Sequence, residues 1–114
     1  MKSIVALAGM KYRGTEDLVR TMKDGEAVRL VRERDNAHDP NAVQVWAKDG
    51  AAQDVMLGFL KAGLHAGGAV ALLMDRRGLT EMNAKLKVTA DRWPMIEVDD
   101  DAPGRRTTEE RMIG

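Results

Sequence analysis

The chain has 114 residues, a length that suits one domain with a single modest core. It contains no cysteine, which excludes a disulfide framework and a thiolate zinc site. Its 18 basic side chains are balanced by 18 acidic ones, which disfavours extensive coating of duplex nucleic acid, because that role requires a marked basic excess.

The first part of the chain predicts a strand, a loop and a short helix. Residues 4–8 form a continuous apolar run, which is typical of a strand buried on both faces or of a barrel strand. Residues 12–15 then predict a loop. Residues 16–22 predict a short helix, with Thr15 at its N-cap and Gly25 shortly after its end.

The middle of the chain predicts two strands joined by a polar stretch. Residues 28–31 are mainly apolar, and apolar residues alternate with larger or polar ones over 43–48, the period of a half-buried strand. Between them, residues 39–42 read Asp-Pro-Asn-Ala. This order is typical of a tight turn, because Asp bonds to its own backbone and Pro pre-sets φ.

A further strand and the main helix follow. Residues 55–60 predict the strand and residues 61–77 the helix. A helical repeat places Leu60, Leu64, Gly68 and Leu72 on one apolar stripe. Gly78 stands where a C-terminal cap belongs.

Two more strands and a tail complete the chain. Residues 85–90 alternate between apolar and polar, and residues 95–98 form the last strand. Residues 99–114 are rich in acids and predict a disordered tail, which leaves residues 1–98 as the folded domain. Many short strands with one main helix predict a small, curled antiparallel sheet, which is a mainly β (α+β) fold.

Three motifs, which follow one another along the chain as they do in the family, together resemble the HIRAN domain. The pattern R-x-x-x-N-x-x-D-x-N-A is filled by Arg32, Asn36, Asp39, Asn41 and Ala42. Residues 7–12 are similar to the family's first strand and its exit, and residues 57–60 to its Val-Gly-x-Leu segment. The resemblance covers residues 3–98 and implies a six-stranded OB-like β-barrel, with one main helix and a short second helix.

The resemblance also implies a function, the capture of the 3′-hydroxyl end of single-stranded DNA in DNA repair or processing. By the same resemblance, Tyr12 stacks on a base, Lys11 meets a phosphate, Asn36 holds the sugar or phosphate, and Asp39 accepts a hydrogen bond from the 3′-hydroxyl. The full set of expected nucleic-acid-binding residues is Lys11, Tyr12, Arg32, Asp35, Asn36, His38, Asp39, Phe59 and Lys61.

Three of these residues depart from the family pattern. His38 replaces a tyrosine that forms a second wall of the base slot, and Phe59 replaces a polar residue. Asp35 replaces an amide beside the expected phosphate path. These changes suggest altered or weaker end binding, or a different nucleic acid such as RNA.

Other interpretations of the same residues remain open. Tyr12 is alternatively a buried core residue, Lys11 a solvated surface residue, and Asp39 only a turn-former. Asp35, His38 and Asp39 could bind a divalent metal and make a nuclease. A protein-interaction adaptor that docks to a repair or replication protein is the third class.

The expected setting is cytoplasmic. No apolar run reaches the roughly 18 residues that span a membrane, and no secretory signal stands at the N-terminus. No G-x-x-x-x-G-K-[ST] motif is present, so no translocase motor is expected. We expect no cofactor, no metal and no enzymatic activity.

Overall fold

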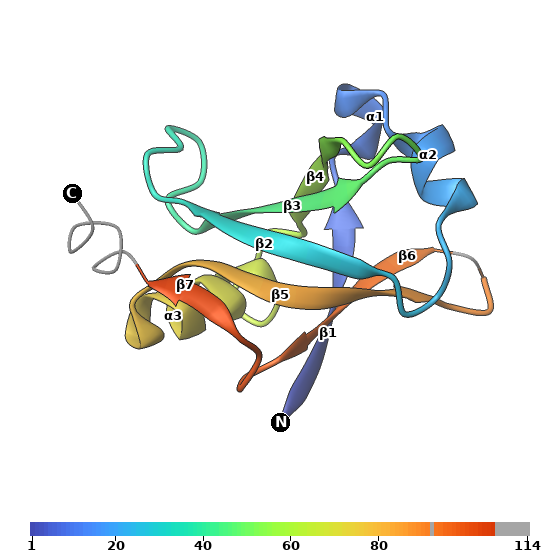
Figure 1. Ribbon diagram of the computed structural model, residues 1–114. Helices are drawn as coiled ribbons and strands as arrows, with labels where there is room; N and C mark the ends of the chain where they lie inside the picture. Colours follow the sequence, from blue (N-terminus) through green and yellow to red (C-terminus); the bar gives the residue numbers. More distant parts are fainter. Residues whose placement is uncertain (92, 107–114) are drawn as a thin grey trace.

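Six antiparallel strands close into a barrel in the computed structural model, which describes residues 1–91 and 93–106 (Figure 1). The predicted mainly β barrel is confirmed. In chain order the elements are β1 (Lys2–Ala8), α1 (Met10–Arg13), α2 (Glu16–Thr21), β2 (Ala27–Glu33), β3 (Ala42–Lys48), β4 (Asp54–Leu60), α3 (Gly67–Arg77), β5 (Leu79–Val88), β6 (Pro94–Asp99) and β7 (Gly104–Arg106).

Most strands of the barrel alternate between inward buried and outward exposed residues, so closure of the sheet brings their apolar faces together. Neighbouring strands follow the order β2-β3-β4-β1-β6-β5, and β5 pairs with β2 to complete the ring. Each strand contributes a fully buried side chain to the interior: Leu7, Leu30, Val45, Leu57, Met82 and Ile96.

The join between β1 and β4 is short. Two register pairs, Leu7 with Leu60 and Ala8 with Phe59, connect these strands, whereas five connect β1 to β6. A Cβ atom on Gly58 would lie 2.2 Å from the carbonyl oxygen of Ala8. Glycine is therefore required for the two backbones to approach this closely.

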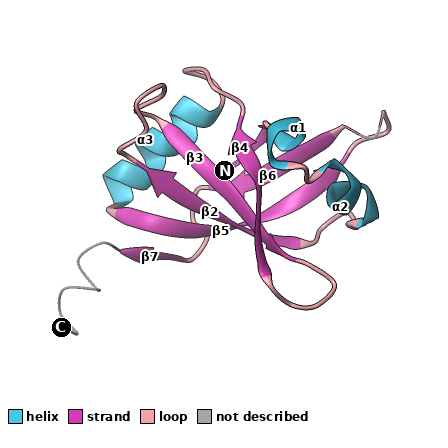
Figure 2. Ribbon diagram, turned by 90° about the horizontal axis from the view of Figure 1, so that it is seen from above, coloured by secondary structure: helices cyan, strands magenta, loops and turns pink. Residues whose placement is uncertain are grey.

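The helices lie at two places on the barrel. Figure 2 shows α3 on one side and α1 and α2 at the opposite end. The segment that follows β2, residues 34–41, links it to β3 and is here called the connector.

The main helix begins later than predicted. Residues 61–66 form a tight turn instead, in which the backbone N–H of Gly67 donates to Lys61 and that of Gly68 to Gly63, both at 2.8 Å. The predicted stripe is wrong: Leu64 is 81% exposed and Leu72 51%. With its start at Gly67, α3 turns a different face inward, formed by Gly67, Val70, Ala71 and Met74. The predicted cap at Gly78 is confirmed by its left-handed φ of 68°.

The exit from β1 also differs from the expected loop. Met10–Arg13 form a helical turn, α1, between Gly9 (φ 79°) and Gly14 (φ 68°). Both glycines adopt the left-handed backbone that most residues avoid. Thr15 precedes α2, as predicted, but its side chain does not cap the helix. Its buried hydroxyl donates to the carbonyl of Leu57 at 2.5 Å.

Regular structure continues past the predicted end of the folded part. β5 begins at Leu79 rather than near residue 85, and β6 pairs only with its second half. The chain then turns back after β6, and β7 pairs with the first half of β5. Residues 99–106 therefore do not fray as we expected, because β5 offers them an open edge. The rest of the predicted tail, residues 107–114, lies outside the described residues.

Candidate nucleic-acid interface

The connector contains the tight turn that the sequence predicts. The carbonyl of Asp39 accepts a hydrogen bond from the backbone N–H of Ala42 at 3.1 Å. The Asp39 side chain accepts another from the N–H of Asn41, with an Oδ1–N distance of 2.9 Å. Asp39 is half-buried at this turn, so its carboxylate has a fixed place on the connector.

Asn36 organises the other half of the connector. Its Oδ1 accepts from the backbone N–H groups of His38, at 2.8 Å, and Asp39, at 2.9 Å. Its Nδ2 donates to Oε2 of Glu33 at 2.7 Å. The Asn36 oxygen is therefore engaged within the protein, where we had expected the amide to hold a ligand.

The hydrogen bonds continue from Glu33 along the outward face of the sheet. Gln44 Nε2 donates to the second carboxylate oxygen, Oε1, at 3.0 Å. Trp46 Nε1 in turn donates to Gln44 Oε1 at 2.8 Å. Our sequence prediction missed Glu33 and Gln44. Because alternate residues of a strand share one face, the sequence could have indicated that Gln44 and Trp46 lie close together.

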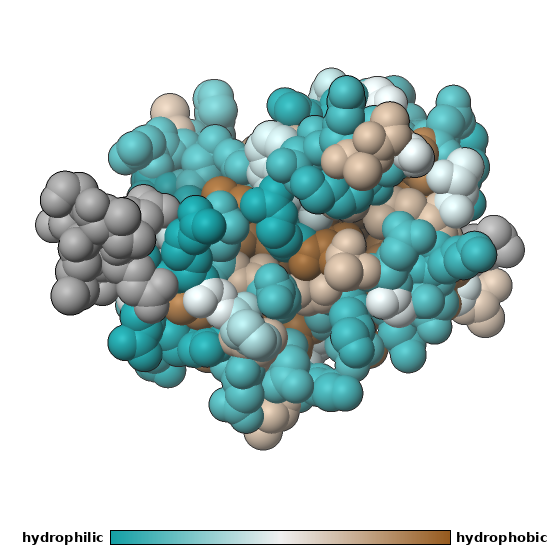
Figure 3. Space-filling model, in the orientation of Figure 1, coloured by the Kyte–Doolittle hydropathy of each residue, from teal (hydrophilic) through white to brown (hydrophobic). Residues whose placement is uncertain are grey.

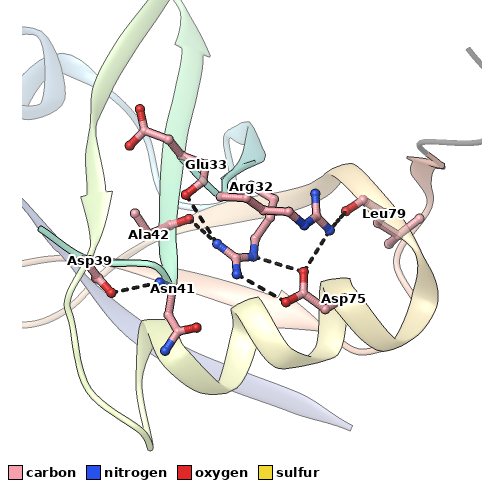
Figure 4. Close-up of polar contacts among 8 residues, drawn as sticks. Arg32, Glu33, Asp39, Asn41, Ala42, Asp75 and Leu79 are labelled. Carbon is pink, nitrogen blue, oxygen red and sulfur yellow. Dashed lines mark hydrogen bonds and ion pairs between the residues drawn. The ribbon is translucent and has the colours of Figure 1, made fainter. Parts of the chain in front are cut away.

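Arg32 is directed toward Asp75 on α3 (Figure 4), and Arg34 bonds to the same residue. The Arg32 side chain is only 4% exposed. Its Nε and Nη2 atoms meet the two carboxylate oxygens of Asp75 at 3.1 and 3.2 Å, and its Nη1 donates to the carbonyl of Ala42 at 3.1 Å. Arg34 Nη2 reaches the same carboxylate at 2.8 Å. The geometry therefore gives no support to the predicted contact of Arg32 with nucleic acid.

Asp75, which our sequence prediction also missed, is held in its charged form. Burial acts to raise the pKa of its carboxyl, but the hydrogen bonds and charges of Arg32 and Arg34 outweigh it. The pKa therefore lies below its ordinary value. The spacing of more than 40 residues between these partners left no local signal in the sequence.

The turn α1 presents an aromatic side chain between two cations. Tyr12 is 92% exposed, and Lys11 and Arg13 are exposed on either side of it. The alternative interpretation of Tyr12 as a core residue is therefore wrong. An aromatic ring this exposed is available to pack against a ligand.

Phe59 lies between α1 and the connector side of the sheet. It is the register partner of Ala8 on β1 and of Gln44 on β3. A Cβ atom on Gly9, at the start of α1, would lie 3.8 Å from the Phe59 ring. Half-buried Phe59 thus links the α1 side to the row that contains Gln44 and Glu33.

The remaining predicted residues are exposed. Asp35 and His38 lie on the connector, and Lys61 directly follows β4. In both views the connector and α1 lie on opposite sides of β4 (Figures 1 and 2). We call these two segments, together with the segment between β4 and α3, the rim surface. It has an acidic end with Glu33, Asp35 and Asp39, and cations at Lys11, Arg13 and Lys61.

A groove of about 640 Å³ is lined in part by Trp46, and none of the nine predicted residues lines it. The predicted residues occupy the rim surface instead. In Figure 3 apolar surface is exposed at the centre of the β2 and β5 face, between polar side chains. Ion pairs neutralise three of the basic residues at the groove: Lys2 with Glu97, Arg29 with Asp54 and Lys48 with Asp54.

The described residues give no support to a metal site. Within residues 1–91 and 93–106, no three acidic or histidine side chains converge in a way that could hold an ion. Asp35, His38 and Asp39 share the connector without forming such a group. In the same part of the chain, no helix has the length and apolar character to cross a bilayer.

A closed barrel with an exposed aromatic turn and a rigid polar connector defines a small β-barrel binding module. The chain belongs to the HIRAN domain family, whose model matches residues 2–88. Membership of this family supports a nucleic-acid-binding module. No curated protein matches the chain in sequence.

Two crystal structures share the fold. The HIRAN domain of human HLTF is 19% identical, with a TM-score of 0.57, and the match covers 98% of this chain and 82% of that one. A protein from Lactobacillus plantarum is 23% identical with the same TM-score of 0.57, covering 87% of this chain and 100% of that one. At these identities the likeness is one of fold.

Proposed function

We propose that this domain binds the end of a single nucleic-acid strand, with the 3′-hydroxyl at Asp39. The observation that carries the proposal is the 92% exposure of Tyr12 on a short turn between two cations. Glycines in left-handed conformations bound this turn on both sides, so the aromatic ring projects from a defined backbone.

Tyr12 would stack on a base near the strand end. Stacking of a base on an aromatic side chain is worth roughly 1–3 kcal/mol and tolerates any sequence. Lys11 and Arg13 precede and follow Tyr12 in the chain and would meet neighbouring phosphates, as Lys61 would from the end of β4. Half-buried Phe59 would offer an apolar wall beside Tyr12 where the family pattern has a polar residue.

The connector would recognise the 3′ end of the nucleic-acid strand. Glu33, Asp35 and Asp39 gather negative charge there, while Arg32 and Arg34 are engaged by Asp75. A continuing or phosphorylated strand would bring another negative charge against these carboxylates, whereas a hydroxyl can donate a hydrogen bond to Asp39. His38 is exposed next to Asp39 and would stack from the connector side.

This assignment gives different roles to the residues of the family motif. Asp39 and His38 would touch the ligand, whereas Arg32 and Asn36 would hold the connector in shape through the contacts described above. We place the activity in DNA repair or processing in the cytoplasm, with RNA ends as the alternative ligand. No cofactor is required by this chemistry.

Fluorescence anisotropy at low salt tests the proposal. A short labelled DNA strand with a free 3′-hydroxyl is compared with the same strand carrying a 3′-phosphate, and with RNA of the same sequence. We expect clearly tighter binding of the hydroxyl end. Equal affinities would show general strand binding without end reading, and no binding to any of them would refute the proposal.

Docking of a protein partner is the second candidate, and it has its own observation. A groove of about 370 Å³ lies between β1 and α3, and two exposed leucines, Leu64 and Leu72, line it. Exposed apolar side chains beside a hollow are a common feature of protein interfaces. An adaptor of this kind would bind no oligonucleotide at low salt and would retain a repair or replication protein.

A further inference from the structure

We propose that Glu33 is a positioning residue that fixes the connector, and with it Asp39, by accepting hydrogen bonds from both sides. The ligand-binding part of this inference rests on the proposed function. Glu33 is the last residue of β2 and is half-buried on the outward face of the sheet. It does not need to touch the strand in order to act, because it acts through Asn36.

Trp46 stands at one end of the hydrogen-bonded row and determines which atoms of the next side chain donate and which accept. An indole Nε1–H can only donate. It donates to Gln44 Oε1, so the carboxamide of Gln44 must turn its Nε2 toward Glu33. The Gln44 side chain therefore presents a donor, not an acceptor, to the residue at position 33.

The direction at the other end is set by the connector backbone. The N–H groups of His38 and Asp39 can also only donate, and both donate to Asn36 Oδ1. The carboxamide of Asn36 must then turn its Nδ2 toward Glu33. Donors consequently converge on position 33 from Gln44 and from Asn36.

Only a side chain that accepts on both sides completes this row. A carboxylate has two accepting oxygens and no hydrogen, and the two oxygens of Glu33 are used at 3.0 and 2.7 Å. A glutamine there would turn an N–H toward one of the two incoming donors. One hydrogen bond would be lost, and the carboxamide of Asn36 would no longer have a single preferred orientation.

The substitution Glu33→Gln, alone and combined with Gln44→Glu, tests this inference. In the double variant, the Trp46 indole and the new carboxamide at position 33 both donate to the new carboxylate at position 44. Asn36 then donates to the carboxamide oxygen at position 33, so each donor again meets an acceptor. Glu26→Gln is the matched control, since exposed Glu26 lies before β2 and its substitution removes the same charge.

The first readout needs no ligand. NMR hydrogen exchange follows the His38 and Asp39 amides together with the chemical shift of the Trp46 indole N–H. We expect Glu33→Gln to accelerate exchange of both amides by about tenfold and to shift the indole signal. The double variant should return both amides to within about twofold of the wild-type rate, and Glu26→Gln should change nothing.

The second readout is binding of the 3′-hydroxyl strand. We expect Glu33→Gln to weaken binding by about tenfold and the double variant to recover it. Unchanged exchange in the single variant, or failure of the double variant to recover, would overturn the inference. So would normal affinity alongside accelerated exchange. If Glu33→Gln does not fold, recovery of folding in the double variant supports it. If wild-type protein binds no strand, the proposed function fails, and exchange alone decides the role of Glu33.

Discussion

Arg32 and Asp75 form a two-pronged ion pair that ties the end of β2 to α3. Nε and Nη2 of the guanidinium lie 3.1 and 3.2 Å from the two carboxylate oxygens (Figure 4). Nη1 also donates to the carbonyl of Ala42, the first residue of β3. One side chain therefore holds both ends of the connector, and Arg34 binds the same carboxylate.

Replacing Arg32 with lysine should destabilise the fold. Lysine lacks the planar fork, so it cannot reach Asp75 with two bonds and the Ala42 carbonyl with a third. We expect a loss of about 1–3 kcal/mol in the free energy of unfolding, measured with urea. Arg34→Lys serves as the control, since Arg34 is 43% exposed and should change stability by less than about 1 kcal/mol. Equal effects of the two substitutions would contradict the special role of Arg32.

The ion pair should also leave a mark on the pH dependence of stability. The folded-state pKa of Asp75 lies below the ordinary 3.8, so its contribution is fully present above that pH. It is lost as the pH falls below that value and through the folded pKa. Asp75→Asn should remove this part of the acid slope, which thermal melts between about pH 2 and 6 would measure. Parallel curves for the two proteins would show that Asp75 is not held in its charged form.

Tyr12→Ala should abolish much of the strand affinity without affecting stability. The lost stacking corresponds to a decrease of about 5- to 150-fold in affinity. Because the side chain is 92% exposed, the melting temperature should stay nearly constant. Tyr12→Phe keeps the ring and should retain most of the binding. A large fall in melting temperature for Tyr12→Ala would point instead to a structural role.

Asp39→Asn separates end reading from turn formation. The amide oxygen can still accept from the N–H of Asn41, so the turn should be preserved. The negative charge is lost, however, and with it the repulsion of a terminal phosphate. We expect the preference for a 3′-hydroxyl over a 3′-phosphate to shrink toward unity in anisotropy titrations. Asp39→Ala, which also removes the turn bond, should lose stability as well as preference.

Gly58→Ala tests the close approach of β4 to β1. The new Cβ would lie 2.2 Å from the backbone oxygen of Ala8, which cannot move aside without parting the strands. We expect a loss of about 3 kcal/mol or more in the free energy of unfolding. Gly50→Ala has open space around it and should stay within about 0.5 kcal/mol of wild type. A stable Gly58→Ala protein would mean that the join can widen.

Local patterns were sufficient to predict much of the barrel. Alternation predicted β3 and the second half of β5, and short apolar runs predicted β1 and part of β2. The Asp-Pro-Asn-Ala order predicted the turn at Asp39. The stripe through Leu64 and Leu72 was wrong because the tight turn at residues 61–66 delays the helix and rotates its inward face. β7 could not be predicted because its three residues are held by an open edge of β5, which only the assembled sheet provides.

The candidate site, like the barrel, could be predicted from local patterns only in part. The sequence predicted which stretches would carry polar and aromatic groups, but it could not predict which of them face outward. Arg32 belongs to the family pattern, yet its partner Asp75 lies 43 positions away. Glu33 and Gln44 come together only through the pairing of β2 with β3. The contribution of the structure is therefore to separate groups that can meet a ligand from groups that hold the connector.

The short join between β1 and β4 has a mechanical consequence. α1 continues directly from β1, and Lys61 continues directly from β4, so the two basic parts of the rim surface are attached to opposite sides of this join. A nucleic-acid strand bound to both basic parts would bridge the join between β1 and β4, where the fewest backbone hydrogen bonds hold neighbouring β-strands together. A pulling force on the bound nucleic acid would act first on the hydrogen bonds between β1 and β4. A nucleic-acid end bound without tension would stabilise the same bonds.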